Sequence, residues 1–190
     1  CIVGTNNGTE LLHDGQEVTV DCSSGEEGLV YEGKLKFEIE EHDLKKMPKT
    51  KTKIMMNVGN PEHVFEQSTI PCDGVGLARE EFIINSHIKI HPLALIHFDH
   101  LKDQQAKQAI IDMTRGYAVK TDYYVDELAE GIGMIAAAFY PRKVIVRMAD
   151  FKSNEYANLV GGKEFEHKED NPMIGWRGAS RYYSEKYKPA

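Results

Sequence analysis

From residue 52 onward, short apolar runs of strand length alternate with helical patterns. The runs are "KIMMNV" (residues 53–58), "GVGLA" (74–78) and "KVIV" (143–146). Continuous apolar runs of this length are typical of strands that are buried on both faces. When helices separate such strands, the strands usually pair in parallel. The alternation therefore predicts parallel βα units, and the chain is expected to be of the α/β class.

Helical signals fill the spaces between these runs. In "NPEHVFEQ", Asn60 is a candidate N-cap and Pro61 occupies the first helical position. Two longer segments, residues 103–116 and 121–141, carry apolar residues at helical spacing. The apolar positions are Ala106, Ala109, Ile110 and Met113 in the first, and Val125, Leu128, Ile132, Ile135 and Phe139 in the second. Each segment is predicted to form a helix that packs one face on the sheet.

The first forty residues have a different pattern. Residues 17–22 and 34–40 alternate polar with apolar side chains, and the run 28–33 between them follows a glycine-rich turn. This pattern predicts short strands joined by tight turns. The charged segment 41–53 then breaks the alternation, and we place a domain boundary near Pro48. The predicted domains are residues 1–47 and 48–190.

Composition narrows the classes of partner. The chain of 190 residues is 41% hydrophobic and 28% charged, with a formal net charge of -7. This negative charge disfavours binding to nucleic acid. The longest apolar stretch is too short to cross a bilayer, so no membrane contact is expected. Three widely spaced cysteines indicate neither a disulfide framework nor a zinc site, and a cytoplasmic location is expected.

Three arginines are the main candidates for a binding site. Arg79 and Arg147 follow apolar strand runs directly, and Arg177 stands in "GWRG". In a barrel of βα units, the carboxyl ends of the strands form the active site. Guanidinium groups match the geometry of carboxylate and phosphate, so these residues predict a site for a small anion. The alternative is that each arginine pairs with a nearby acid such as Glu81 or Asp150.

Polar residues near Arg147 are candidates for supporting roles. Asp150 could orient Arg147 through a hydrogen bond, and the pair Asn154 and Glu155 could cap the next element or face the ligand. The spacing of His87 and His91 would suit a metal pair only on a helix, and "HIKIHP" looks irregular or β-like instead. No metal site is therefore expected in this chain.

Long motifs at these residues resemble those of a known family. "GVGLAREEF" (74–82), "VIVRMADFKSNEYANLVGG" (144–162) and "DNPMIGWRGASRYY" (170–183) resemble the phosphoenolpyruvate synthases, or pyruvate, water dikinases, of the PEP-utilising enzymes. The segment "CIVGTNNGTELLHDGQEVTVDCSSGEEGLVYEG" (1–33) resembles the end of that family's swivelling phosphohistidine domain. The resemblance covers essentially the whole chain.

The resemblance implies a specific chemistry. These enzymes convert pyruvate, ATP and water to phosphoenolpyruvate, AMP and phosphate with Mg²⁺, through a phosphohistidine on the swivelling domain. Residues 1–47 would end that domain, and residues 48–190 would supply the first strands and helices of the phosphoenolpyruvate- and pyruvate-binding (β/α)8 TIM barrel. The family's substrate-gripping arginines match Arg79, Arg147 and Arg177. The resemblance also implies a homo-oligomer formed through the barrel.

The same resemblance implies that parts of the machinery are missing. The phosphorylated histidine, the ATP-binding domain, the Mg²⁺ ligands and a proton-donating cysteine match no residue of this chain. The chain is therefore expected to be a fragment, inactive alone, whose open sheet edge favours association or partial disorder. Three alternatives remain open: a relative from pyruvate phosphate dikinase or the sugar phosphotransferase system, a barrel lyase, and a non-catalytic anion-binding module.

Overall fold

The computed structural model describes every residue of the chain except 1, 3, 24–26 and 42. The chain divides into two compact units, Cys1–Asp43 and Leu44–Ala190, which are described separately below. The division falls shortly before the boundary that the sequence predicts at Pro48. Within the described residues, no helix is both long enough and apolar enough to cross a membrane.

The first unit contains a β-hairpin. Its elements are helix α1 (Gly8–Leu11) and strands β1 (Val18–Asp21) and β2 (Leu29–Glu32). The two strands pair antiparallel with Val18 opposite Glu32, as predicted for the runs at 17–22 and 28–33. The side chain of Thr19 closes the hairpin, because its hydroxyl donates to the carbonyl of Gly33 at 2.7 Å.

The prediction of a strand at residues 34–40 is wrong. This segment has no regular secondary structure, and its apolar side chains are exposed, Phe37 by 77% and Ile39 by 76%. The preference of alternating apolar residues for strands reflects packing against neighbouring strands. Of the described residues of this unit, only those of β1 and β2 form strands, and neither strand pairs with the segment.

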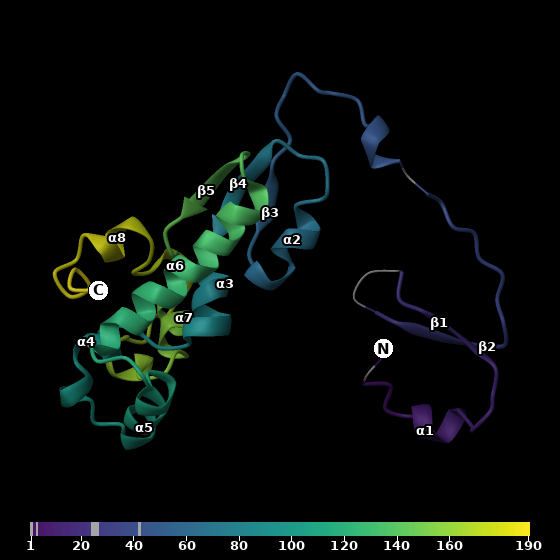
Figure 1. Cartoon of the computed structure of the whole chain (residues 1–190). Helices are drawn as coiled ribbons and strands as arrows, with labels where there is room; N and C mark the ends of the chain where they lie inside the picture. The colour runs from purple at the N-terminus through teal and green to yellow at the C-terminus, as the bar shows by residue number, and fades with distance from the viewer. Residues whose placement is uncertain (1, 3, 24–26, 42) are drawn as a thin grey trace. The chain divides into compact units, whose positions relative to one another are not determined.

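The second unit is built on a three-stranded parallel sheet (Figure 1). Its strands are β3 (Met56–Val58), β4 (Gly74–Arg79) and β5 (Lys143–Arg147), and β4 lies in the centre. The helices are η1 (Leu44–Lys46), η2 (Pro61–His63), α2 (Val64–Gln67), α3 (Glu81–Ile83), η3 (Ile84–Ile88), α4 (Pro92–Ile96), η4 (Phe98–His100), α5 (Gln104–Met113), α6 (Lys120–Phe139), α7 (Ser153–Ala157), η5 (Gly162–Glu164), η6 (Pro172–Ile174) and α8 (Ala179–Tyr182). The parallel βα units predicted from the apolar runs are confirmed.

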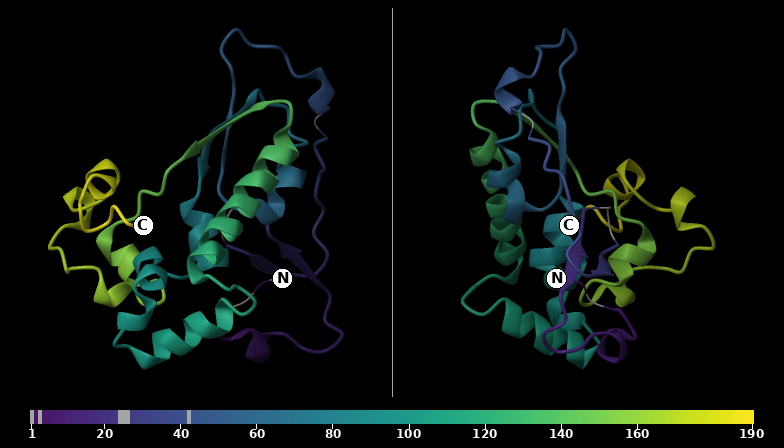
Figure 2. Two further views of the ribbon diagram at one scale, coloured as in Figure 1. Left: turned by 60° about the vertical axis from the view of Figure 1, so that its left-hand side comes forward. Right: turned by 90° about the vertical axis from the view of Figure 1, so that its right-hand side faces the viewer.

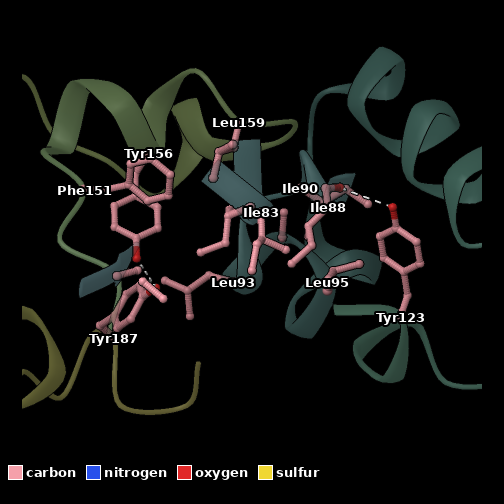
Figure 3. Packing of buried hydrophobic residues seen from close by; sticks show 14 of the residues in the cluster. Ile83, Ile88, Ile90, Leu93, Leu95, Tyr123, Phe151, Tyr156, Leu159 and Tyr187 are labelled. Carbon is pink, nitrogen blue, oxygen red and sulfur yellow. Dashed lines mark hydrogen bonds between the residues drawn. The ribbon is translucent and has the colours of Figure 1, made fainter. Parts of the chain in front are cut away.

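Helix α6 packs along β4 and β5, and the views of Figures 1 and 2 agree on this arrangement. Ile135 and Phe139 are buried as predicted, whereas Val125 is 62% exposed. Gly131 allows α6 to lie close to α3, because a Cβ there would lie 2.8 Å from Ile83. The core of the unit continues from these residues to the isoleucines of α3 and η3 and to the aromatic residues Phe151, Tyr156 and Tyr187 (Figure 3).

The predicted N-cap at Asn60 is confirmed, since its side-chain oxygen accepts from the backbone N–H of Glu62 at 2.9 Å. We expect Asn60→Ala to lower the free energy of unfolding by about 1 kcal/mol, because a donor at the start of η2 loses its partner. Urea denaturation would measure the change. Asn60→Ser, which keeps an accepting oxygen, is the matched control. Equal losses for alanine and serine would contradict the capping role.

Candidate functional site

Strands β4 and β5 bring two of the predicted arginines together. Arg79 and Arg147 are the last residues of their strands and are register partners in the parallel pair. Since partners in adjacent strands point to the same face of a sheet, the two side chains leave the sheet on one side. The carboxyl ends of β4 and β5 therefore present two guanidinium groups to the same region.

A cavity of about 350 Å³ lies at this edge of the sheet, and the third predicted arginine also lines it. Its lining residues are Arg79, Glu81, Phe82, Asn85, Arg147, Asp150, Phe151, Lys152, Glu155 and Arg177. The volume is at the lower end of the range for small-molecule sites. The structure thus brings Arg79, Arg147 and Arg177 to one cavity, although Arg177 lies far along the chain from β4.

Arg177 and Asp150 form a bidentate ion pair. Its Nε and Nη2 atoms donate to the two carboxylate oxygens of Asp150, both at 2.9 Å. This hydrogen bonding lowers the pKa of the Asp150 carboxyl and raises the pKa of the Arg177 guanidinium. The following Gly178 has a φ of 54°, and a Cβ there would lie 3.2 Å from Asp150 Oδ1. Glycine at this position therefore allows the loop to turn back onto Asp150.

Arg147 pairs with a different acid from the one expected to orient it. Its Nη2 donates to Glu81 Oε1 in a short ion pair, whereas Asp150 Oδ2 lies 3.9 Å from Nη1. The same Glu81 oxygen accepts from the backbone N–H of Asp150 at 2.8 Å. The expectation that Asp150 orients Arg147 by a hydrogen bond is wrong, because Asp150 is already engaged by Arg177. Glu81 orients Arg147 instead.

Arg79 has different surroundings from those of Arg147 and Arg177. Its guanidinium carbon lies 4.6 Å from the centre of the Phe82 ring, and no carboxylate of the described residues forms an ion pair with it. Around the cavity, the cations are the three arginines and Lys152, and the carboxylates are those of Glu81, Asp150 and Glu155. Four positive and three negative groups leave one net positive charge in a chain whose net charge is -7.

The predicted supporting residues Asn154 and Glu155 have different environments in the structure. Glu155 accepts from the backbone N–H of Lys152 at 2.8 Å, which caps α7, and it also lines the cavity. Asn154 is exposed and does not line the cavity. The capping alternative therefore holds for Glu155, and the alternative that it faces a ligand stays a prediction.

The histidines do not form a metal pair on one helix. Ile88 ends η3, and Lys89 follows with a φ of 59°, so His87 and His91 lie on different segments. Within the part of the chain that the structure describes, no three His, Cys, Asp or Glu residues are grouped closely enough to hold a metal ion. His91 is instead buried among aromatic rings, between 5.3 and 5.4 Å from those of Tyr156 and Phe165.

Sequence reasoning missed a buried ionic cluster beside the cavity, formed by His91, Glu166 and Arg181. The side chains of Arg181 and His91 are 0% exposed and that of Glu166 is 1% exposed. Arg181 donates to both oxygens of Glu166, at 2.5 and 2.8 Å, and His91 Nε2 lies 3.0 Å from the first oxygen. The available signal was an arginine in a run rich in aromatic residues, but no spacing connects Arg181 to Glu166.

The protonation of this cluster follows from its hydrogen bonds. His91 Nδ1 accepts from the backbone N–H of Leu93, so Nε2 carries the proton and donates to Glu166. Burial lowers the pKa of His91, which keeps the ring neutral. Burial also raises the pKa of the Glu166 carboxyl, but hydrogen bonds from Arg181 and His91 outweigh it and bring that pKa to about 2. The cluster therefore contains one buried ion pair and one neutral imidazole.

Comparison with known proteins gives one consistent family. Residues 37–188 match the family model of the PEP-utilising enzyme, PEP-binding domain. The chain is 58% identical to phosphoenolpyruvate synthase of Synechocystis sp. over 100% of its length, 54% identical to that of Neisseria meningitidis over 99%, and 48% identical to that of Escherichia coli over 99%.

The chain covers 23% of the Synechocystis relative and 24% of the other two, so it spans about a quarter of their length. The family match begins at residue 37 and includes the three arginines of the cavity. It therefore covers the whole of the parallel sheet and the loop that carries Arg177. By this match and by the identities, the chain belongs to the PEP-utilising enzymes, as a segment similar to part of phosphoenolpyruvate synthase.

Proposed function

We propose that this chain supplies the substrate-gripping part of a phosphoenolpyruvate synthase, which converts pyruvate, ATP and water to phosphoenolpyruvate, AMP and phosphate. The observation that carries the proposal is the convergence of Arg79, Arg147 and Arg177 on one cavity at the carboxyl ends of parallel strands. The relatives are named phosphoenolpyruvate synthase, and the reaction is the one that the resemblance of the motifs implies. The chain would thus provide the clamp for pyruvate and for the phosphoryl group that is transferred to it.

The charges of the cavity suit phosphoenolpyruvate. This molecule carries a carboxylate and a phosphate, and guanidinium forks bind both groups with paired hydrogen bonds. No carboxylate among the described residues pairs with Arg79, so its guanidinium is available to a ligand. The Arg147 side chain is 41% exposed, and one nitrogen of its guanidinium group pairs with Glu81. Phosphoryl transfer depends mainly on positioning and on charge stabilisation, and three arginines can supply both.

Glu81 and Asp150 would keep the arginines oriented until the substrate arrives. Each carboxylate fixes one guanidinium by hydrogen bonds, at Arg147 and Arg177 respectively. A guanidinium fixed in this way loses less conformational freedom when it binds an anion, which favours tighter binding. The acids also limit the positive charge of the empty cavity, which reduces binding of unrelated anions.

The acids of this cavity do not fit a Mg²⁺ site. Glu81 and Asp150 are both engaged by arginine, and no cluster of metal-ligating side chains occurs in the described ranges. In the proposed enzyme, Mg²⁺ and ATP would be held by residues other than those of this cavity.

We also propose the domain assignment that the resemblance implies. Residues 1–47 would be the end of a swivelling phosphohistidine domain, and residues 48–190 the beginning of a TIM barrel that associates into a homo-oligomer. The hairpin of β1 and β2 and the parallel order β3-β4-β5 are compatible with this assignment. A structure of an enzyme that has the relatives' full length and carries this segment (the long enzyme) would test both the barrel and the oligomer.

Arg79 offers the direct test of the proposed clamp. We expect Arg79→Ala to weaken binding of phosphoenolpyruvate to the long enzyme by about tenfold or more, since a hydrogen bond to a charged group contributes about 1.5–3 kcal/mol. Calorimetric titration would measure the dissociation constant. Arg115→Ala is the matched control, because the Arg115 side chain is 85% exposed and, within the described part of the chain, its ion-pair partner is Asp112. Equal affinities for the two variants would overturn the proposal.

A further inference from the structure

The loop that carries Arg177 rests on a buried arginine. The Arg181 guanidinium lies 3.9 Å from the centre of the Trp176 ring and 4.2 Å from that of Tyr156. Its Nη2 atom also donates to the backbone carbonyl of Trp176 at 3.1 Å. Arg181 therefore contacts both the side chain and the backbone of the residue that precedes Arg177.

The backbone of Trp176 is also held on the other side of its Cα atom, at its N–H. The backbone N–H of Trp176 donates to Glu169 Oε1 at 2.7 Å, and the hydroxyl of Ser153 lies 3.5 Å from the Trp176 carbonyl oxygen. Both backbone polar atoms of Trp176 are thus fixed by side chains from elsewhere in the unit. Because Arg177 follows directly, the direction in which its side chain leaves the backbone depends on these contacts.

Glu166 fixes Arg181 in turn. The two hydrogen bonds between them match the planar edge of the guanidinium, and His91 holds the same carboxylate. A buried arginine with paired bonds and aromatic neighbours has little freedom to change its position. The contacts therefore run from His91 through Glu166 and Arg181 to Trp176, and the next residue is the one that faces the cavity.

We propose that Arg181 is a positioning residue for anion binding: its bonds to Glu166 and to the Trp176 carbonyl hold Arg177 in the geometry that grips the substrate. This inference rests on the proposed function, because it assigns Arg181 a role through Arg177. Arg181 does not line the cavity, so it acts without touching the ligand. Lysine at position 181 would keep the charge, but it lacks the planar guanidinium that forms the paired hydrogen bonds to Glu166.

A double-mutant cycle in the long enzyme tests the inference. We expect Arg181→Lys to weaken binding of phosphoenolpyruvate by about fivefold to tenfold, and to raise the KM for pyruvate by a similar factor. In the Arg177→Ala background, the same change should weaken binding by less than about twofold, since the group that it positions is gone. In the Arg79→Ala background, it should keep its full effect. Arg115→Lys is the matched control.

The outcomes separate the inference from the proposed function. If Arg177→Ala alone leaves the affinity unchanged, the proposed function fails. If Arg177→Ala weakens binding but Arg181→Lys does not, or if the two effects add in full, only the positioning role fails. A purely structural role would lower the folded fraction and kcat while leaving KM unchanged, which also overturns the inference. Should Arg181→Lys not fold, Glu166→Asp replaces it in the same cycle, because the shorter carboxylate displaces Arg181 while keeping the charge.

Discussion

Replacing Arg147 by alanine is expected to lower kcat/KM of the long enzyme by about 10²- to 10³-fold. Arg147 is the register partner of Arg79 and lines the cavity. In the proposed function, charge moves there during phosphoryl transfer. Removing one preorganised donor from such a site typically has an effect of this size. The measurement is the steady-state rate of phosphoenolpyruvate formation from pyruvate and ATP.

The loss should arise from chemistry and not from unfolding. The Arg147 side chain is 41% exposed, and after its removal Glu81 still accepts from the backbone N–H of Asp150. The free energy of unfolding should therefore fall by no more than about 1–3 kcal/mol, because the Glu81 side chain, which is 12% exposed, loses one hydrogen-bond partner. Arg147→Lys, which keeps the charge, should recover only part of the activity because it lacks the planar fork. Unchanged kinetics in Arg147→Ala would remove this residue from the site.

Much of the parallel sheet and of the cavity could be predicted because the relevant signals are local. An apolar run followed directly by arginine identifies both a buried strand and a polar group at its carboxyl end. The parallel topology then brings Arg79 and Arg147 together without further information. The "GWRG" motif made Arg177 a candidate, but its place beside Arg79 and Arg147 could not be predicted locally, because its loop reaches the cavity through its contact with Asp150.

The failures share a physical cause, which is that pairing partners distant in sequence decide the outcome. Asp150 is three residues from Arg147, yet it accepts hydrogen bonds from Arg177. Glu81, from the preceding βα unit, accepts the hydrogen bond from Arg147. The segment 34–40 alternates like a strand but has no strand beside it in the described part of its unit. The cluster of His91, Glu166 and Arg181 joins three separated segments.

Replacing Glu166 by glutamine is expected to lower the free energy of unfolding by about 3–5 kcal/mol at neutral pH. The change would leave the Arg181 guanidinium buried without a counter-charge, and breaking a buried ion pair from one side typically has this effect. Urea denaturation followed by Trp176 fluorescence would measure it. Trp176 is the only tryptophan of the chain and stacks on Arg181. Glu185→Gln is the matched control, since the Glu185 side chain is 89% exposed.

The pH dependence of the free energy of unfolding provides a second test of this prediction. The folded-state pKa of Glu166 is about 2, below the ordinary value of 4.5. A depressed carboxyl pKa contributes stability above the unfolded-state pKa, and this contribution falls as the pH decreases from about 5 toward 2. The stability difference between the native chain and Glu166→Gln should therefore shrink over this interval. A difference that stays constant down to pH 2 would show that the charge of Glu166 does not stabilise the cluster. In that case, the stability lost in Glu166→Gln would have to come from altered packing around Trp176 and not from the unpaired guanidinium of Arg181.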